Sequence, residues 1–168
     1  MTQKLIGKYF TFKFVGRKYD ISGVVLDYND EWTYIRTVED YSPNGFTIFK
    51  NKKVEYYYGE NEKMATKILK LKNYIYKNEP SIALSSLDQI LNSIDNKYGL
   101  IQLDTQKGDA SDVVKYLKQV DSLYLFDELT TLAKWRYKLK LQEKECRFIC
   151  FDNDYLNSLK LVTKFKLK

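Results

Sequence analysis

The sequence predicts a mainly β protein of the β-rich α+β class, built as two tandem small bent β-barrels with a connecting helix. Three observations lead to this class. Aromatic residues make up 15% of the chain and include 15 tyrosines, against seven glycines and two prolines, and tyrosine and phenylalanine favour the half-buried surface of a sheet. Short alternating runs separated by turn residues fill both halves of the chain. The two halves also resemble each other at a constant spacing.

The first section reads as five short strands. Pro43 fixes φ and the pair Asn44-Gly45 tolerates positive φ, so residues 42–45 form a strong turn signal. Gly16 marks another turn, and Gly23 marks a bend or bulge inside a strand. The expected strands cover residues 8–15, 19–26, 32–38, 46–49 and 54–58.

A helical pattern separates the two β-rich sections. Apolar residues recur at helical spacing between Leu87 and Ile94, Ser85 or Ser86 is a suitable N-cap, and Gly99 ends the pattern. A second helical pattern covers residues 61–71, but residues 67–72 alternate like a strand, so both interpretations stay open there. Beyond Gly99, strands are expected at 100–103, 113–120, 123–131, 134–141 and 146–151.

These elements divide the chain into three parts. Residues 1–75 form the first barrel, residues 76–97 form a linker with the helix, and residues 98–168 form the second barrel. Trp32 corresponds to Tyr124 and Tyr56 to Phe148, both at an offset of 92 residues. Few residues are identical, so an internal repeat and a chance agreement between two β-rich segments are both open.

The residues of the first section resemble the Sm-like family of small β-barrels. Gly23 lies inside the second strand and Asp27 at its end. Residues 49–54 match the family's closing turn between the last two strands, with Asn51 in the place of a glycine. The resemblance covers about residues 8–58 and implies a bent barrel topology. It departs from the family after Asp27, where a Met-Asn pair is missing. If it extended to RNA binding, the binding residues would be Tyr28, Lys50 and Asn51.

The composition argues against several kinds of chemistry. The chain has no histidine, so it lacks the commonest general base and cannot complete a usual zinc site around Cys146 and Cys150. No glycine-rich phosphate loop is present. The carboxylates at Asp27, Asp30 and Glu31 have no spacing that fixes a reacting pair and are typical of polar turns. We therefore expect no enzyme activity, no cofactor and no metal.

The charge is basic without the pattern of a dedicated nucleic-acid reader. The net charge is +6, from 24 lysines and four arginines against 22 acidic residues, and it is spread evenly along the chain. Lysine is a point charge, whereas arginine has the planar fork that reads phosphate and guanine. The sequence indicates general affinity for anions.

One strand carries the best candidate surface. Lys134, Arg136, Lys138 and Lys140 alternate with apolar residues. In a regular strand all four would point one way, with neighbours about 7 Å apart, similar to backbone phosphates. The alternative is a solvated strand face whose lysines deter edge pairing.

These observations favour a non-enzymatic binding module that acts through protein–protein interaction. Tyrosine supplies a large contact area with a polar end. The alternative is binding of single-stranded RNA through lysine and aromatic surfaces. The protein partner stays unidentified, and a homo-oligomer is compatible with the sequence. No segment approaches the roughly 20 apolar residues that span a bilayer, and the N-terminal residues lack the apolar run of a signal peptide, so we expect a cytoplasmic protein without membrane contact.

Overall fold

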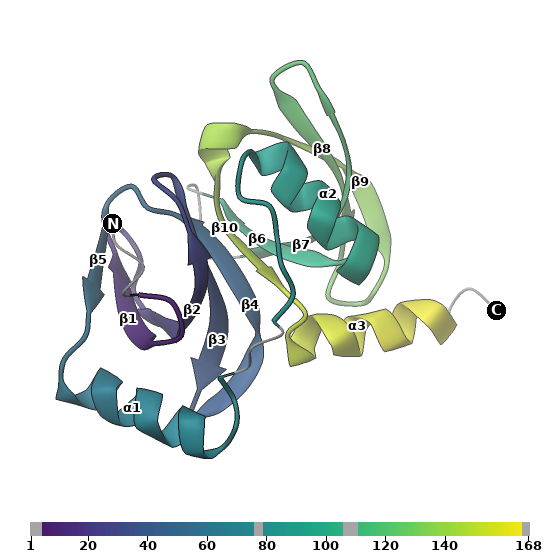
Figure 1. Cartoon of the computed structure of the whole chain (residues 1–168). Helices are drawn as coiled ribbons and strands as arrows, with labels where there is room; N and C mark the ends of the chain where they lie inside the picture. The colour runs from purple at the N-terminus through teal and green to yellow at the C-terminus, as the bar shows by residue number, and fades with distance from the viewer. Residues whose placement is uncertain (1–4, 76–78, 106–110, 166–168) are drawn as a thin grey trace. The chain divides into compact units, whose positions relative to one another are not determined.

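The computed structural model describes residues 5–75, 79–105 and 111–165 (Figure 1). Its strands outnumber its helices, and the described residues contain three α-helices and one short 3₁₀ helix. The predicted mainly β, α+β class is therefore confirmed. The chain divides into two compact units, Met1–Ser81 and Ile82–Lys168. None of the described helices is both long and apolar enough to span a membrane.

Unit 1 is an antiparallel sheet followed by a helix. The first strand lies inside the sheet between the second and the fifth, so the order is β5-β1-β2-β3-β4. The pattern at 61–71 forms a helix. The N–H of Gly59, at the N-terminus of this helix, donates a hydrogen bond to the Glu62 carboxylate. The elements are β1 (Tyr9–Phe14), β2 (Ile21–Tyr28), β3 (Trp32–Glu39), β4 (Ser42–Lys50), β5 (Val54–Tyr57) and α1 (Glu60–Leu71).

Unit 2 has the same strand order with an additional helix in front. Its sheet runs β10-β6-β7-β8-β9. The 3₁₀ helix Glu143–Glu145 connects the last two strands. The elements are α2 (Leu87–Tyr98), β6 (Ile101–Thr105), β7 (Ser111–Val120), β8 (Leu123–Leu129), β9 (Trp135–Gln142), β10 (Cys146–Phe151) and α3 (Asp154–Phe165).

The two units repeat the same elements at a nearly constant distance along the chain. Each strand of unit 2 begins 90 to 93 residues after its counterpart in unit 1, and α3 begins 94 residues after α1. In both units the fifth strand pairs with the first. The correspondence therefore includes hydrogen-bond pairing as well as element order.

The expected closure into two barrels is not found. Both sheets are open, and among the described residues β5 pairs with β1 alone. In unit 1, β5 has only four residues before the chain turns at Gly59 into α1. In unit 2 the 3₁₀ helix interrupts the chain between β9 and β10.

Helix α2 lies in unit 2, which begins at Ile82. Residues 76–78 of the expected linker at 76–97 lie outside the described residues. The Ser86 hydroxyl accepts a hydrogen bond from the Gln89 N–H, and Gly99 ends the helix with φ +76°. The Tyr116 hydroxyl of β7 donates to Asp88 at 2.5 Å. Helix α2 is thereby fixed to its own sheet.

The segment after α1 is held against β3 of unit 1. The Arg36 guanidinium donates two hydrogen bonds to the Glu79 carboxylate, at 2.6 and 3.2 Å, and stacks 4.0 Å from the centre of the Phe46 ring. The Tyr34 hydroxyl donates to the carbonyl oxygen of Pro80 at 3.1 Å. These contacts bring residues 79 and 80 over the sheet.

Candidate functional site: an aromatic pocket beside a strand edge

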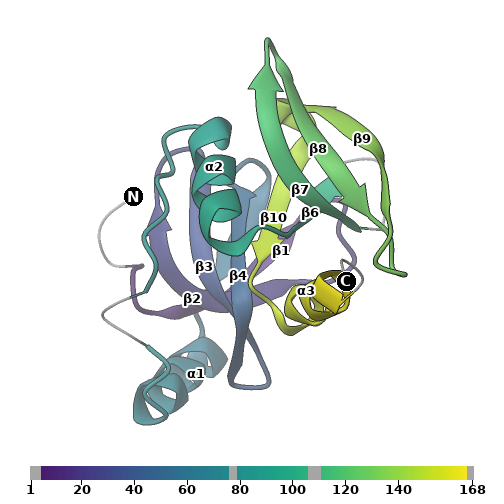
Figure 2. The same cartoon turned by 90° about the vertical axis from the view of Figure 1, so that its right-hand side faces the viewer.

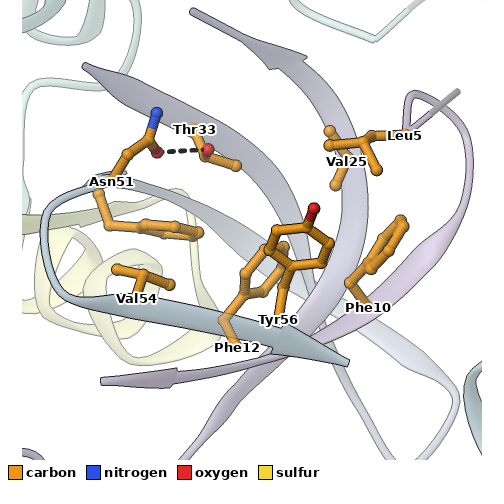
Figure 3. A pocket seen from close by; sticks show the side chains of 9 residues that line it. Leu5, Phe10, Phe12, Val25, Thr33, Asn51, Val54 and Tyr56 are labelled. Carbon is orange, nitrogen blue, oxygen red and sulfur yellow. Dashed lines mark hydrogen bonds between the residues drawn. The ribbon is translucent and has the colours of Figure 1, made fainter. Parts of the chain in front are cut away.

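An aromatic pocket opens on one face of the unit 1 sheet (Figure 3). Its accessible interior is about 50 Å³. Alternation along β1 places Phe10 and Phe12 on this face. Phe12 packs against Phe49 of β4 in an edge-to-face contact, with ring centres 4.9 Å apart. All five strands contribute to the lining, which consists of Leu5, Phe10, Phe12, Val25, Thr33, Phe49, Asn51, Val54 and Tyr56.

Two polar side chains lie at one end of this pocket. The Thr33 hydroxyl donates to Asn51 Oδ1 at 2.6 Å, and Asn51 Nδ2 donates to the carbonyl oxygen of Asn29 at 2.8 Å. The Asn51 N–H also bonds to the Glu31 carbonyl. The amide of Asn51 therefore ties the β4–β5 turn to the β2–β3 turn, and this end of the pocket is fixed by internal bonds.

The opposite side of the pocket is a strand edge. β5 is the outermost strand of the sheet, and Figure 1 shows it at the margin of the unit. Tyr56 and Tyr57 of this strand are 50% and 46% exposed. The Tyr56 ring stands over the pocket, 5.9 Å from the Phe10 ring in an edge-on arrangement. The pocket is thus open at the edge where a further strand could pair.

The hydrogen-bonding pattern shows which groups of β5 point outward. The Val15 N–H donates to the Lys53 carbonyl at 3.3 Å, so residues 15 and 53 are a hydrogen-bonded pair. Bonded and non-bonded pairs alternate along an antiparallel ladder. The register therefore leaves Val54 and Tyr56 with their N–H and C=O groups directed away from β1. The side chains of the same two residues line the pocket.

The pocket has the chemistry of a binding site for apolar groups. None of its lining residues is an acidic or basic side chain. The described residues contain no cluster of three His, Cys, Asp or Glu side chains able to hold a metal ion. The shifted pKa values belong to groups outside the pocket, such as Tyr116, whose pKa is raised by burial and by its bond to Asp88. The walls supply shape and apolar contact.

The three residues taken from the Sm-like resemblance do not form one site. Tyr28 pairs in register with Thr33 and so shares the pocket face, with Asn51 at the same end. Lys50 pairs with Trp32 on the other face, where its ammonium lies 5.0 Å from the indole centre and 3.4 Å from a Glu31 carboxylate oxygen.

The closing turn also differs from the expected one in its backbone. The resemblance places Asn51 where the family has a glycine, a position suited to positive φ. In the structure the turn residue with positive φ is Lys53, at +59°. Asn51 is instead held by its side-chain bonds to the β2–β3 turn.

The basic strand is exposed, but its four cations do not form one row. Lys134, Arg136, Lys138 and Lys140 are all exposed. Lys134 precedes β9, which begins at Trp135. The register shifts by one residue between the pair Asp127–Lys138 and the pair Leu129–Trp135. This irregularity breaks the alternation, so Trp135 falls on the same face as Lys138 and Lys140.

Comparison with known protein families, with characterised proteins and with solved structures finds no match for this chain. The arguments for function therefore rest on the geometry of the site itself. Sequence reasoning missed the pocket because its walls come from five strands. The alternation of Val54 and Tyr56 on a short final strand is the one local signal that pointed to it.

Proposed function

We propose that this protein is a non-enzymatic protein-binding module that takes an extended segment of a partner as an additional strand on β5. One observation carries the proposal. Val54 and Tyr56 direct their main-chain hydrogen-bonding groups to the open edge, and their side chains line the aromatic pocket. Strand addition uses this combination, because main-chain bonds supply affinity and pockets for alternate side chains supply specificity.

The pocket and its surroundings define the segment that fits. A residue directly opposite Val54 or Tyr56 on the added strand shares their face, so its side chain enters the pocket. An aliphatic side chain of moderate size suits the apolar walls and the interior of about 50 Å³. Lys52 and Lys53 are exposed in the turn before β5, which favours an acidic residue at that end of the segment.

We also propose that each unit is an incompletely closed form of a small bent barrel of the Sm-like kind. The support is the short connection between the two outermost strands of unit 1. In unit 1, β4 and β5 lie at opposite ends of the strand order, yet only residues 51–53 join them. A flat sheet of five strands would separate its edges by about 19 Å, whereas four extended residue steps span at most about 14 Å. The sheet must therefore curl.

The experiment uses a random library of linear peptides displayed on phage, selected on the whole protein. Tyr56→Pro removes the outward N–H of Tyr56 without removing a bond to β1, and the extended Glu55 before it accepts a proline. Tyr56→Val is the matched control, because it removes the same ring and keeps the N–H. We expect selected peptides with alternating apolar residues, a loss of binding of at least tenfold in Tyr56→Pro, and a smaller loss in Tyr56→Val.

Two results would overturn the proposal. Equal binding of the selected peptides to wild type and Tyr56→Pro would show that they use another surface. A wild-type dimer in sedimentation that Tyr56→Pro converts to a monomer would mean that a second copy of the chain occupies the edge. Thermal unfolding of each variant checks that unit 1 remains folded.

A further inference from the structure

A group of lysines on the β7–β8–β9 ladder of unit 2 shares one exposed face. Lys115 and Lys138 both pair with Asp127, and Lys118 and Lys140 both pair with Leu125. Directly opposed residues of an antiparallel sheet lie on the same face. The four lysines, named here the lysine face, are all exposed. Only the sheet register brings them together, since 25 residues separate Lys115 from Lys140.

The same face carries an exposed indole next to these lysines. At one end of the ladder Val113 and Leu129 are covered by Leu156 and Leu159 of α3, and Figure 2 shows α3 near the ends of β7 and β8 away from their connecting turn. Trp135 pairs with Leu129 and is 48% exposed. The indole therefore lies between the helix-covered end and the lysine face.

We propose that the lysine face with Trp135 binds single-stranded nucleic acid, a function beyond strand addition on β5 and independent of it. Lys138 and Lys140 are two residues apart in β9 and therefore about 7 Å apart. Lys115 and Lys118 are three residues apart in β7, across a register shift that keeps both on this face. The β7 and β9 columns are about 10 Å apart, so the face can follow a sugar–phosphate backbone. An exposed indole supplies a platform on which a base stacks. Proteins that bind single strands combine positive charge that follows the backbone with aromatic side chains on which bases stack.

The carboxylate at the centre of the face favours nucleic acid over an acidic polypeptide. Asp127 lies between Lys115 and Lys138 in register. It repels a chain whose own side chains are carboxylates, whereas it accepts a hydrogen bond from the exocyclic amino group of a base such as cytosine. The carboxyl of Asp95 on α2 also interacts with Lys115; its pKa is raised by burial and partly lowered by that lysine. We therefore expect a preference for cytosine over thymine that depends on Asp127.

The intrinsic fluorescence of the protein reports directly on this site. The chain has two tryptophans, and Trp32 is fully buried. A change in tryptophan emission on addition of oligodeoxycytidine of about 15 nucleotides thus reports contact with Trp135. We expect quenching by oligodeoxycytidine, weaker binding of oligothymidine, and equal binding of the two by Asp127→Asn.

Charge variants test the role of the lysines against general electrostatics. Changing Lys115, Lys118, Lys138 and Lys140 together to Gln should reduce affinity at low salt at least tenfold. It should also flatten the slope of log affinity against log salt by about 3, since each phosphate contact on a single strand contributes about 0.7. The matched control changes the exposed Lys18, Lys52, Lys67 and Lys70 of unit 1 to Gln, with the same loss of charge and little loss of binding.

Variants of the indole complete the test, with binding read from a fluorescent label on the oligonucleotide. Trp135→Ala should lower affinity at least fivefold, and Trp135→Phe should restore part of it, because phenylalanine also stacks. Three results would each overturn the proposal. The first is an equal loss of affinity in the control charge variant, and the second is absence of binding at low salt. The third is displacement of the oligonucleotide by polyglutamate at equal charge concentration.

Discussion

Gly23 lies where the backbone of β2 passes close to that of β3. A Cβ atom at this position would stand 2.2 Å from the carbonyl oxygen of Arg36 and 3.0 Å from Ile35 Cδ1. The nearest obstacle is main chain, so it cannot move aside as a side chain can. The sequence indicated a bend or bulge at this glycine, whereas the register shift in β2 falls between Val25 and Asp27. The residue is needed for the close approach of two strands.

We predict that Gly23→Ala destabilises unit 1 by about 1–3 kcal/mol, the usual cost of forcing atoms into a packed interior. Urea unfolding followed by far-ultraviolet circular dichroism measures the change. A loss below about 0.5 kcal/mol, typical of exposed sites, would contradict the close approach of β2 and β3.

At the scale of elements, Glu62 joins α1 to the sheet. Its carboxylate accepts hydrogen bonds from the Gly59 N–H at 2.8 Å and from the Thr11 hydroxyl of β1 at 2.9 Å. Burial raises the pKa of this carboxyl, but these hydrogen bonds outweigh burial and hold the pKa below its ordinary value of 4.5. A carboxyl whose pKa is lower in the folded state stabilises that state above the unfolded pKa. The stabilisation is lost as the pH falls through the folded pKa.

We therefore predict that Glu62→Gln lowers the free energy of unfolding at neutral pH by at most about 1 kcal/mol, since solvent screens the charge. The difference from wild type should shrink below pH 4.5 as the wild-type carboxyl becomes protonated. Glu60→Gln, at the exposed start of the same helix, is the control, because the Glu60 carboxylate bonds to the exposed Lys63 of that helix rather than to Gly59 and Thr11. Urea unfolding across the pH range checks this, and a deficit that persists unchanged in acid would contradict it.

Several elements could be predicted from the sequence because their signals are local. Ser86, Gly99 and the apolar spacing between them define α2, and turn residues separate most strands. The contacts that an element makes with other elements depend on residues far away in the sequence. No pattern near α2 indicates that Asp88 bonds to Tyr116, so the sequence alone did not predict the hydrogen bond that joins this helix to β7.

The candidate sites were less predictable for the same reason. The alternation of cations at 134–140 is visible in the sequence, but the register shift in β9 changes which of them share a face. Lys115 and Lys118 join that face from another strand, and no pattern along β9 could indicate them. Asn51 was named as a candidate because of its position in a turn. In the structure its side-chain hydrogen bonds join two turns, which is a structural role.

At the scale of the whole molecule, the two units share a strand order but differ on their surfaces. Phe10 and Phe12 of the pocket correspond to Gln102 and Asp104 at the offset of 92 residues, and the half-exposed Tyr56 corresponds to the buried Phe148. Unit 2 therefore has different side chains at these three positions.

The lysine face is equally confined to one unit. By strand register, Lys138 and Lys140 correspond to Thr47 and Phe49, which are buried in unit 1. The repeated strand order thus supports two different surfaces, and the two proposed ligands belong to different units.

Amide hydrogen exchange along β5 tests the central claim most directly. In the free protein, the N–H groups of Val54 and Tyr56 should exchange faster than those of Glu55 and Tyr57, which bond to β1. On addition of a peptide selected on the wild-type protein, Val54 and Tyr56 should become protected at least tenfold, while Glu55 and Tyr57 change little. A bound peptide that leaves the exchange of Val54 and Tyr56 unchanged would contradict strand addition on this edge.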